Sequence, residues 1–222
     1  DYISFDTALF FNQIEINTMR KSLLFVWACM GLVCLMSACK TSVKSKEWKL
    51  VWVEDFDQKN SFDESVWTKI PRGTSDWNNY MSYYDSCYAM QDGNLILRGI
   101  ANHTQKNDTA PYLTGGVYTK GKKLFTGGRV EVCARLQAAK GAWPAIWMLP
   151  EKAEWPKGGE IDIMERLNHD RIAYQTTHSY YTHILGIKDN PPHGGINKIN
   201  PEEYNIYSVD IYPDSLVFAV NH

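Results

Sequence analysis

Three carboxylates stand close together in one short stretch of the chain, at Glu160, Asp162 and Glu165. Successive side chains of a β-strand point to opposite faces, so Glu160 and Asp162 would share one face of a strand here. Strict alternation would put Glu165 on the opposite, apolar face, where a carboxylate would be buried without a partner. One extra residue at Met164, a β-bulge, returns Glu165 to the acidic face. The stretch therefore predicts a strand with three carboxylates on one side.

This spacing suits the hydrolysis of a glycosidic bond. Glu160 and Glu165 are about four strand steps apart, so their Cα atoms would lie roughly 13 Å apart. Side chains that lean toward each other can bring two carboxyl groups to about 5–5.5 Å, the separation that retaining glycosidases use. The first glutamate would attack the anomeric carbon, and the second would protonate the leaving oxygen and later activate water. Asp162 is placed to hydrogen-bond a glutamate, and clustered like charges would keep one carboxyl protonated.

Two other interpretations of the acidic stretch compete with catalysis. A carbohydrate-binding jelly roll without activity would keep the aromatic residues but would not need both glutamates. A divalent-cation site would use all three carboxylates, but flexible oxygen cages usually come from loops, whereas Ile161 and Ile163 hold these residues on a strand. We favour a retaining glycosidase that needs no cofactor, and the sequence leaves a structural calcium ion open.

The elements that must position this stretch are strands. Asp92-Gly93 and Pro213-Asp214 are turn signals, and no sustained helical period follows Cys39. Many short strands with turns between them indicate an all-β sandwich or barrel. Strands are predicted at 48–56, 94–98, 114–119, 129–136, 143–149, 171–181 and 204–220.

Composition sets the size and excludes some partners. The chain has 222 residues, of which 44% are hydrophobic, enough for one domain with a substantial core. A net charge of −2 provides no electrostatic attraction to nucleic acid or to an anionic membrane surface. Eight tryptophans and thirteen tyrosines suit stacking on sugar rings, although core packing must account for most of them. We expect a monomer with a glycan substrate.

The acidic stretch and its flanks resemble one known family. Residues 160–165 read E-I-D-I-M-E, similar to the bulged E-x-D-x-x-E signature of glycoside hydrolase family 16, and 141–150 read G-A-W-P-A-I-W-M-L-P, similar to its preceding strand. The resemblance covers about 48–220. It implies a concanavalin A-like β-jelly-roll sandwich with a concave cleft, and endo-hydrolysis of a β-linked polysaccharide or glycan with retention. It also implies Glu160 as nucleophile, Asp162 as its helper and Glu165 as acid/base.

Five further residues are candidates for substrate contact. Trp143 and Trp155 bracket the acidic strand and are predicted to stack on sugar rings. His178 should lie on the neighbouring strand, where the family carries a histidine facing the cleft; a structural histidine bonded within the sheet is the alternative. The family resemblance also implies that Arg72 and Asn78 reach the cleft from a loop on its opposite side.

One departure from the family concerns the substrate. Where many glucan-cleaving members read N-N-E-L-Q-Y-Y, this chain has Tyr80 and Ser82 in place of the glutamate and glutamine. The exchange puts cleavage of laminarin, a β-1,3-glucan, in doubt. It leaves room for a galactose-containing target, either a β-galactan or the poly-N-acetyllactosamine arms of mucin-type glycans. Trp147, in the middle of an apolar strand, is predicted to be a core residue.

The amino-terminal region has the pattern of an export signal. A basic start at Met19, an apolar run over 23–36 and the small residues before Cys39 are typical of a secretory signal. The ending resembles a bacterial lipobox, with Cys39 as the lipidated residue; a transmembrane anchor would need about 20 apolar residues. We therefore predict residues 1–18 as an upstream extension outside the fold, 19–38 as a lipoprotein signal peptide, 39–46 as a linker and 47–222 as the catalytic domain. The expected location is the bacterial cell envelope after export, either lipid-anchored at the outer surface or in the periplasm.

Two expectations concern the end of the chain and the remaining cysteines. The sequence stops at His222 inside what should be a hairpin, so the domain is expected to be incomplete at its carboxyl end and to fold poorly because of unpaired strand edges. Cys87 and Cys133 are predicted to be independent buried thiols, with a disulfide between them as the alternative.

Overall fold

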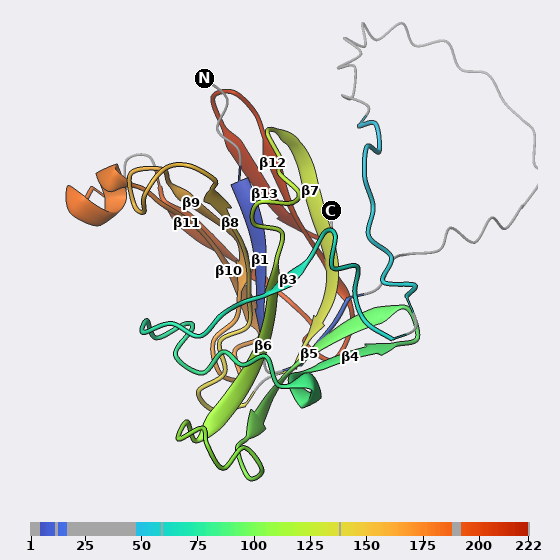
Figure 1. Ribbon diagram of the computed structural model, residues 1–222. Coiled ribbons are helices and arrows are strands. Elements are labelled where there is room, and N and C mark those ends of the chain that lie inside the picture. Colours follow the sequence, from blue (N-terminus) through green and yellow to red (C-terminus); the bar gives the residue numbers. More distant parts are fainter. Residues whose placement is uncertain are drawn as a thin grey trace, which may run out of the picture.

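The computed structural model describes residues 5–11, 13–16, 48–58, 60–137, 139–187 and 192–221 (Figure 1). The described residues form thirteen strands, with one short 3₁₀ turn at Asp85–Cys87 and one π-helical turn at Tyr180–Ile184. The prediction of an all-β fold is confirmed.

The strands form two antiparallel sheets that pack into a sandwich. The first sheet has the order β11 (Gly194–Lys198), β10 (Ile172–His178), β9 (Glu160–Glu165), β8 (Ala145–Pro150), β1 (Phe5–Phe11) and β6 (Tyr112–Tyr118), with β3 (Thr68–Lys69) also on β6. The second has the order β5 (Asn94–Ala101), β2 (Gln13–Ile16), β7 (Gly128–Leu136), β12 (Asn205–Ile211) and β13 (Leu216–Val220), with β4 (Tyr88–Gln91) also on β5. The end of β5 pairs with the start of β6 and joins the two sheets.

Two of these strands come from the region that the sequence analysis placed outside the fold. β1 lies between β8 and β6, and β2 lies between β5 and β7. Each insertion satisfies the backbone N–H and C=O groups of two neighbouring strands, which is what a sheet requires of every buried backbone group. Parts of residues 1–18 thus pair with both sheets.

The core lies between the sheets, and strand β8 is covered on both faces. Ile146 and Met148 are fully buried in the main core. Ala145 and Trp147 point the other way, into a second cluster with Ile70. The prediction that Trp147 is buried is confirmed, but it packs on the outer face of the sheet, the face that carries the carboxylates. The main core holds Leu95, Leu97, Val117, Ala134, Leu136, Ile161, Ile163, Met164, Tyr207 and Val209 among others.

One predicted strand is wrong. Residues 48–56 are not part of either sheet. Side chains hold this segment in place instead: the Trp52 ring lies 6.4 Å from the Trp67 ring and 5.7 Å from the Phe125 ring, and the Trp67 indole donates to Glu54 at 3.0 Å. The alternation of Trp and Val therefore reflects packing of one side of an extended segment onto the core, without a strand partner.

Two other boundaries differ from the sequence expectation. The strand predicted over 171–181 ends at His178, where the chain turns into the π-helical turn. The region 204–220 is a hairpin of β12 and β13, with its turn closed by a hydrogen bond from Tyr212 N to Ser215 O.

Cys87 and Cys133 are not bonded to each other, as predicted. Cys87 is buried as expected, whereas Cys133 is only partly buried. Burial raises the pKa of Cys87 to about 11, so this thiol is protonated and unreactive at neutral pH. The predicted signal peptide, the linker and Cys39 fall within 17–47, outside the described residues. In the described part of the chain, no helix is long and apolar enough to cross a membrane.

Candidate active site

Strand β9 carries the bulge that the sequence predicts. On β10, Thr176 faces Asp162 and Tyr174 faces Glu165, so Ile163–Met164 together oppose a single residue of the partner strand. The pairing of β9 with β8 shifts at the same place. Both bulge residues are fully buried in the core. The extra residue therefore turns Glu165 back to the face that carries Asp162.

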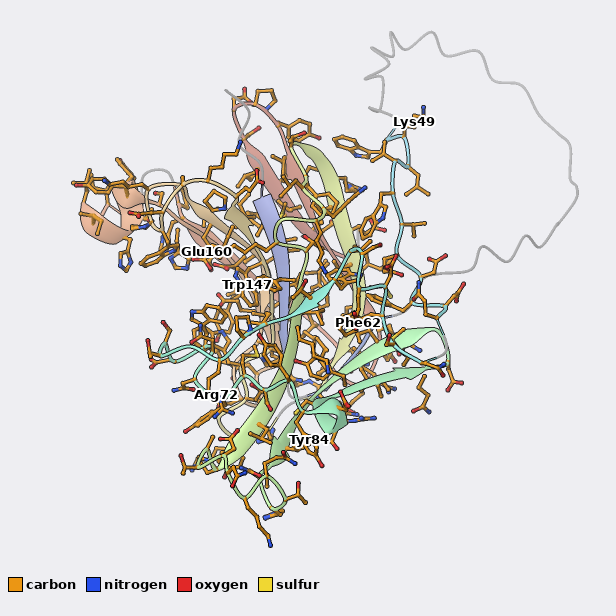
Figure 2. The ribbon with its side chains drawn as sticks, in the orientation of Figure 1. Lys49, Phe62, Arg72, Tyr84, Trp147 and Glu160 are labelled. Atoms are coloured by element: carbon orange, nitrogen blue, oxygen red, sulfur yellow. The ribbon has the colours of Figure 1, made fainter. Side chains whose placement is uncertain are left out.

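Each glutamate accepts a hydrogen bond from a tryptophan indole. The Trp155 Nε1–H donates to Glu160 Oε2 at 2.7 Å, and the Trp143 Nε1–H donates to Glu165 Oε1 at 2.8 Å. Trp155 and Trp143 are 47% and 38% exposed, so part of each ring is open to a ligand. The structure thus brings both predicted tryptophans to the two ends of the acidic face (Figure 2 labels Glu160).

His178 pairs with the central carboxylate. It lies opposite Glu160 on β10, and its Nε2 is 3.2 Å from Asp162 Oδ2. When His178 is protonated, the two side chains form an ion pair. The pKa of His178 is raised, chiefly by Asp162. His178 is therefore part of the site, and its observed contact is with the Asp162 carboxylate of the protein itself.

Burial poises the carboxyl groups for proton transfer. It is the largest cause that raises the pKa of Glu160 and the pKa of Glu165 to about 7, and the neighbouring Asp162 raises both further. The tryptophan donors act against this and lower both pKa values. The sequence predicted a raised pKa from like charges, but removal from water contributes more. A pair that carries one proton near neutral pH is what a retaining glycosidase needs.

The loop that carries Trp143 is tied to the residues that follow Glu165. Arg166 N donates to Pro144 O at 2.9 Å, and Asn168 N donates to Ala142 O at 2.8 Å. The Arg166 side chain is buried and bonds to two further backbone carbonyl groups, those of Leu136 and Asp170. These bonds fix one indole donor relative to the strand it serves.

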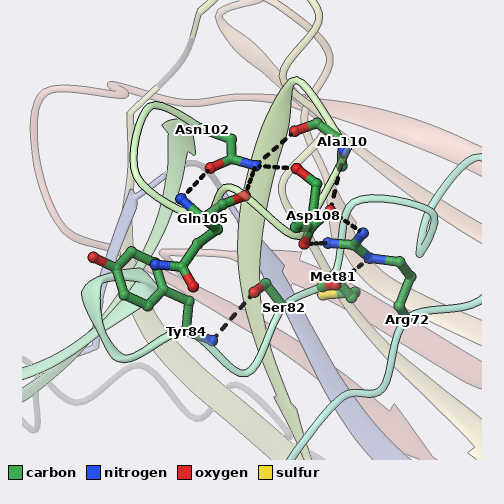
Figure 3. Close-up of polar contacts among 8 residues, drawn as sticks. All are labelled: Arg72, Met81, Ser82, Tyr84, Asn102, Gln105, Asp108 and Ala110. Carbon is green, nitrogen blue, oxygen red and sulfur yellow. Dashed lines mark hydrogen bonds and ion pairs between the residues drawn. The ribbon is translucent and has the colours of Figure 1, made fainter.

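Arg72 serves a contact between two loops. Its guanidinium forms a two-pronged ion pair with Asp108, at 2.6 and 2.7 Å, and its Nε donates to Met81 O at 2.9 Å (Figure 3). In the same region the Asn102 amide donates to the carbonyl groups of Asp108 and Ala110, at 2.8 and 3.0 Å. The guanidinium of Arg72 therefore donates to Asp108 and Met81, and its predicted contact with substrate stays a prediction.

Asn78 lines a cavity of about 460 Å³ beside the catalytic strand. The cavity also touches Trp155, Trp147 and Trp77. The Trp77 and Trp147 rings meet edge to face, with centroids 5.6 Å apart. Sequence reasoning missed Trp77, because its loop reaches the face of β8 only through the tertiary fold.

The described residues contain no group of three or more His, Cys, Asp or Glu arranged to hold a metal ion. The two glutamates accept indole hydrogen bonds, and Asp162 lies against His178. The described geometry thus directs indole and imidazole groups at the carboxylates.

A β-sandwich with a bulged acidic strand, two glutamates of raised pKa and flanking tryptophans is characteristic of carbohydrate-active jelly rolls. A family model described as "XgeA-like, catalytic GH16 domain" matches residues 88–200, about half of the chain. The chain belongs to glycoside hydrolase family 16. This confirms the resemblance found in the sequence.

Similar proteins include enzymes with two kinds of substrate in their names. A keratan-sulfate endo-1,4-β-galactosidase of Sphingobacterium multivorum is 37% identical over 187 residues, which cover 82% of this chain and 43% of that protein. A β-glucanase of Rhodothermus marinus is 29% identical over 215 residues, 91% of this chain and 72% of that protein. The laminarinase structure from Rhodothermus marinus superposes with a TM-score of 0.69 at 29% identity, covering 79% of this chain and 72% of that one. The chain thus spans less than half of the galactosidase and about three quarters of the others.

Proposed function

We propose that this domain is an endo-acting, retaining glycoside hydrolase that cleaves a β-linked glycan by double displacement. The observation that carries the proposal is the acidic face of β9. There Glu160 and Glu165 share one side of the strand, each with a raised pKa and each held by an indole N–H. A binding protein would have no use for two partly buried carboxyl groups whose ionisation costs free energy.

The two steps follow from this arrangement. Glu160 attacks the anomeric carbon while Glu165 gives its proton to the departing glycosidic oxygen, so a glycosyl-enzyme ester forms and one chain leaves. Glu165, now ionised, takes a proton from water, whose oxygen attacks the same carbon and releases Glu160. Asp162 and His178 keep a charged pair beside the nucleophile, and the negative charge of Asp162 favours the protonated form of Glu165.

For the substrate, we propose internal β-galactosidic bonds of keratan-sulfate or poly-N-acetyllactosamine chains. The relative named as a keratan-sulfate endo-1,4-β-galactosidase shares 37% identity, against 29% for the β-glucanase. The chain also replaces two polar groups of the glucan-cleaving pattern. Tyr80 packs its ring against Tyr112 at 6.1 Å, and the Ser82 hydroxyl accepts from Tyr84 N at 3.2 Å. These positions therefore present an aromatic ring and a small hydroxyl, without a carboxylate. β-1,3-Glucan is the alternative, because the structural neighbours include laminarinases.

The test is a panel of keratan sulfate, desulfated poly-N-acetyllactosamine, β-galactan and laminarin. We expect internal cleavage of the first two and no release by Glu160→Gln. Glu203→Gln, at an exposed glutamate in the loop before β12, is the matched control and should keep full activity. Cleavage of laminarin alone would move the substrate to β-1,3-glucan. Binding without cleavage would favour the carbohydrate-binding alternative.

We also propose that the enzyme is exported and held at the bacterial cell envelope by a lipid on Cys39. The basic start, the apolar run and the small residues before Cys39 support this. Expression of the chain in a bacterial host with a labelled fatty acid tests it: the label should appear in the parent protein and be absent from Cys39→Ser. Label retained by the variant would contradict the proposal.

A further inference from the structure

A short turn follows the strand that carries His178. It starts at Ser179 and contains the π-helical residues Tyr180–Ile184, and it projects from one end of β10 (Figure 1). Its first residues cap each other: Thr182 N donates to Ser179 Oγ at 3.2 Å, and Ser179 N donates to Thr182 Oγ1 at 3.0 Å. His183 N donates to Ser179 O at 2.8 Å. The backbone of His183 is therefore fixed relative to the end of β10.

The side chain of His183 reaches the candidate active site. Its ring lies 4.3 Å from the Trp155 ring, centroid to centroid, in an edge-on arrangement with an interplanar angle of 61°. The Trp155 indole in turn donates to Glu160 at 2.7 Å. His183 thus contacts Trp155, and Trp155 contacts Glu160, the proposed nucleophile.

The segment that carries Trp155 depends on such a contact. Its backbone hydrogen bonds close within the segment, from Gly158 N to Glu154 O and from Gly159 N to Pro156 O, both at 3.1 Å. The ring itself is 47% exposed, so packing covers only about half of it. The bond to Glu160 and the ring contact with His183 both restrict rotation of this indole, so loss of the His183 ring would leave the donor less well oriented.

We propose that His183 is a positioning residue of the active site, which acts through Trp155 to hold the carboxylate of Glu160 in the orientation for attack. The inference rests on the proposed function, because it assigns Glu160 the role of nucleophile. It adds a residue that the sequence did not single out, and it gives the turn after β10 a role in catalysis.

The enzymatic test compares His183→Ala with His183→Phe, which keeps an aromatic ring beside Trp155, and with Ile184→Ala, an exposed neighbour in the same turn. We expect His183→Ala to lower kcat by about tenfold with little change in KM, because misplacement of a reacting group affects the chemical step. His183→Phe should restore most of the activity, and Ile184→Ala should match the parent. Equal activity of His183→Ala and the parent would overturn the proposal.

A double-mutant cycle shows whether His183 acts through the indole. In a Trp155→Phe background, which already lacks the N–H, His183→Ala should cause no further loss. The acid limb of the kcat/KM profile should also move to higher pH in His183→Ala, because a weaker bond from Trp155 would let the pKa of Glu160 rise. Burial, Asp162 and Glu165 raise this pKa, whereas the Trp155 bond and His178 lower it. An equal loss in both backgrounds, or an unmoved acid limb, would show that His183 acts by another route.

A readout without substrate separates this inference from the proposed function. In protein labelled with ¹⁵N at tryptophan, the indole N–H resonance of Trp155 should follow the ionisation of Glu160 and should shift or broaden in His183→Ala but not in Ile184→Ala. An unchanged resonance would overturn the inference even if the enzyme is active. A changed resonance in a protein that cleaves no glycan would support the contact and reject the activity.

Discussion

The two ends of strand β9 each carry a glutamate bound by an indole donor, but the two donors are held in place by different contacts. At each end an indole N–H donates to a glutamate, from Trp143 to Glu165 and from Trp155 to Glu160. The loop of Trp143 is bonded to residues that directly follow Glu165, among them Asn168, whose side chain accepts from Gly141 N at 2.7 Å. The segment of Trp155 bonds mainly within itself, and its ring leans on His183.

The difference suits the two proposed roles. The acid/base must give a proton and take one back in successive steps, so a rigid donor that keeps Glu165 in one place serves both. The nucleophile attacks with one carboxylate oxygen, and the Trp155 donor orients the carboxylate through its bond to Oε2. This donor is steadied by a ring contact with a separate turn, in place of the backbone bonds that hold the Trp143 loop. The comparison therefore predicts different responses to similar substitutions at the two ends.

The largest expected effects come from removal of the two glutamates. Glu160→Ala and Glu165→Ala should each lose activity on the order of 10³-fold or more on a natural glycan. With an activated aryl glycoside and added azide, Glu165→Ala should give the β-glycosyl azide, because azide attacks the glycosyl-enzyme. Glu160→Ala should give the α-azide by direct displacement. Product anomers determined by NMR check the assignment, and the reverse pattern would exchange the two roles.

Removal of the charge between the glutamates should have the next largest effect. Asp162→Asn should lower kcat about a hundredfold, because the pair with His178 is lost. Asp162 raises the pKa of both glutamates, so a neutral residue there should lower both. Both limbs of the kcat/KM profile should then move to lower pH. Movement of one limb only would show that Asp162 acts on a single glutamate.

The two indole donors provide a matched pair of substitutions. Trp143→Phe and Trp155→Phe each remove an N–H that lowers a pKa, so each should raise the pKa of its own glutamate. The alkaline limb of the kcat/KM profile should move to higher pH for Trp143→Phe, and the acid limb should move to higher pH for Trp155→Phe. Each variant should also lose about tenfold in kcat. A shift of the same limb by both variants would contradict the separate roles of the two ends.

The smallest effect should come from the support of the Trp143 loop. Asn168→Ala removes the acceptor for Gly141 N and places alanine at a φ of 52°, so the free energy of unfolding should fall by about 1–2 kcal/mol. Urea unfolding measures this. Asn168→Gly, which accepts the positive φ, should recover part of the loss and thereby separate backbone strain from the lost bond. A loss of activity as large as that of Trp143→Phe would show that the loop moves during catalysis.

Local periodicity was enough to predict the catalytic strand. The slip in the alternation of apolar and acidic residues has one low-energy solution, a bulge, because every other register buries a carboxylate. It follows that Glu160, Asp162 and Glu165 share a face. The sequence predicts the bulge at Met164, and the structure places it over Ile163–Met164. Periodicity cannot tell which of two adjacent residues is the extra one.

The same reasoning failed where long-range partners decide the structure. The alternating residues 48–56 look like a strand but pair with no strand in the described part of the chain. Parts of 1–18 pair with strands of both sheets, although no pattern in them predicts it. Each outcome depends on which distant segment offers a partner, and that information is spread over the whole chain.

The sequence by itself determined the chemistry: three carboxylates on one face of a bulged strand, within a sandwich of short strands. These follow from periods of two residues and from the cost of burying a charge. Only the tertiary structure decided how that chemistry is held. It brought Trp143 and Trp155 onto the two glutamates, set His178 against Asp162 and placed His183 behind Trp155. Except for Trp155 and Glu160, which are close in sequence, these contacts join residues 16 or more positions apart, and such contacts are fixed by the packing of the elements that carry them.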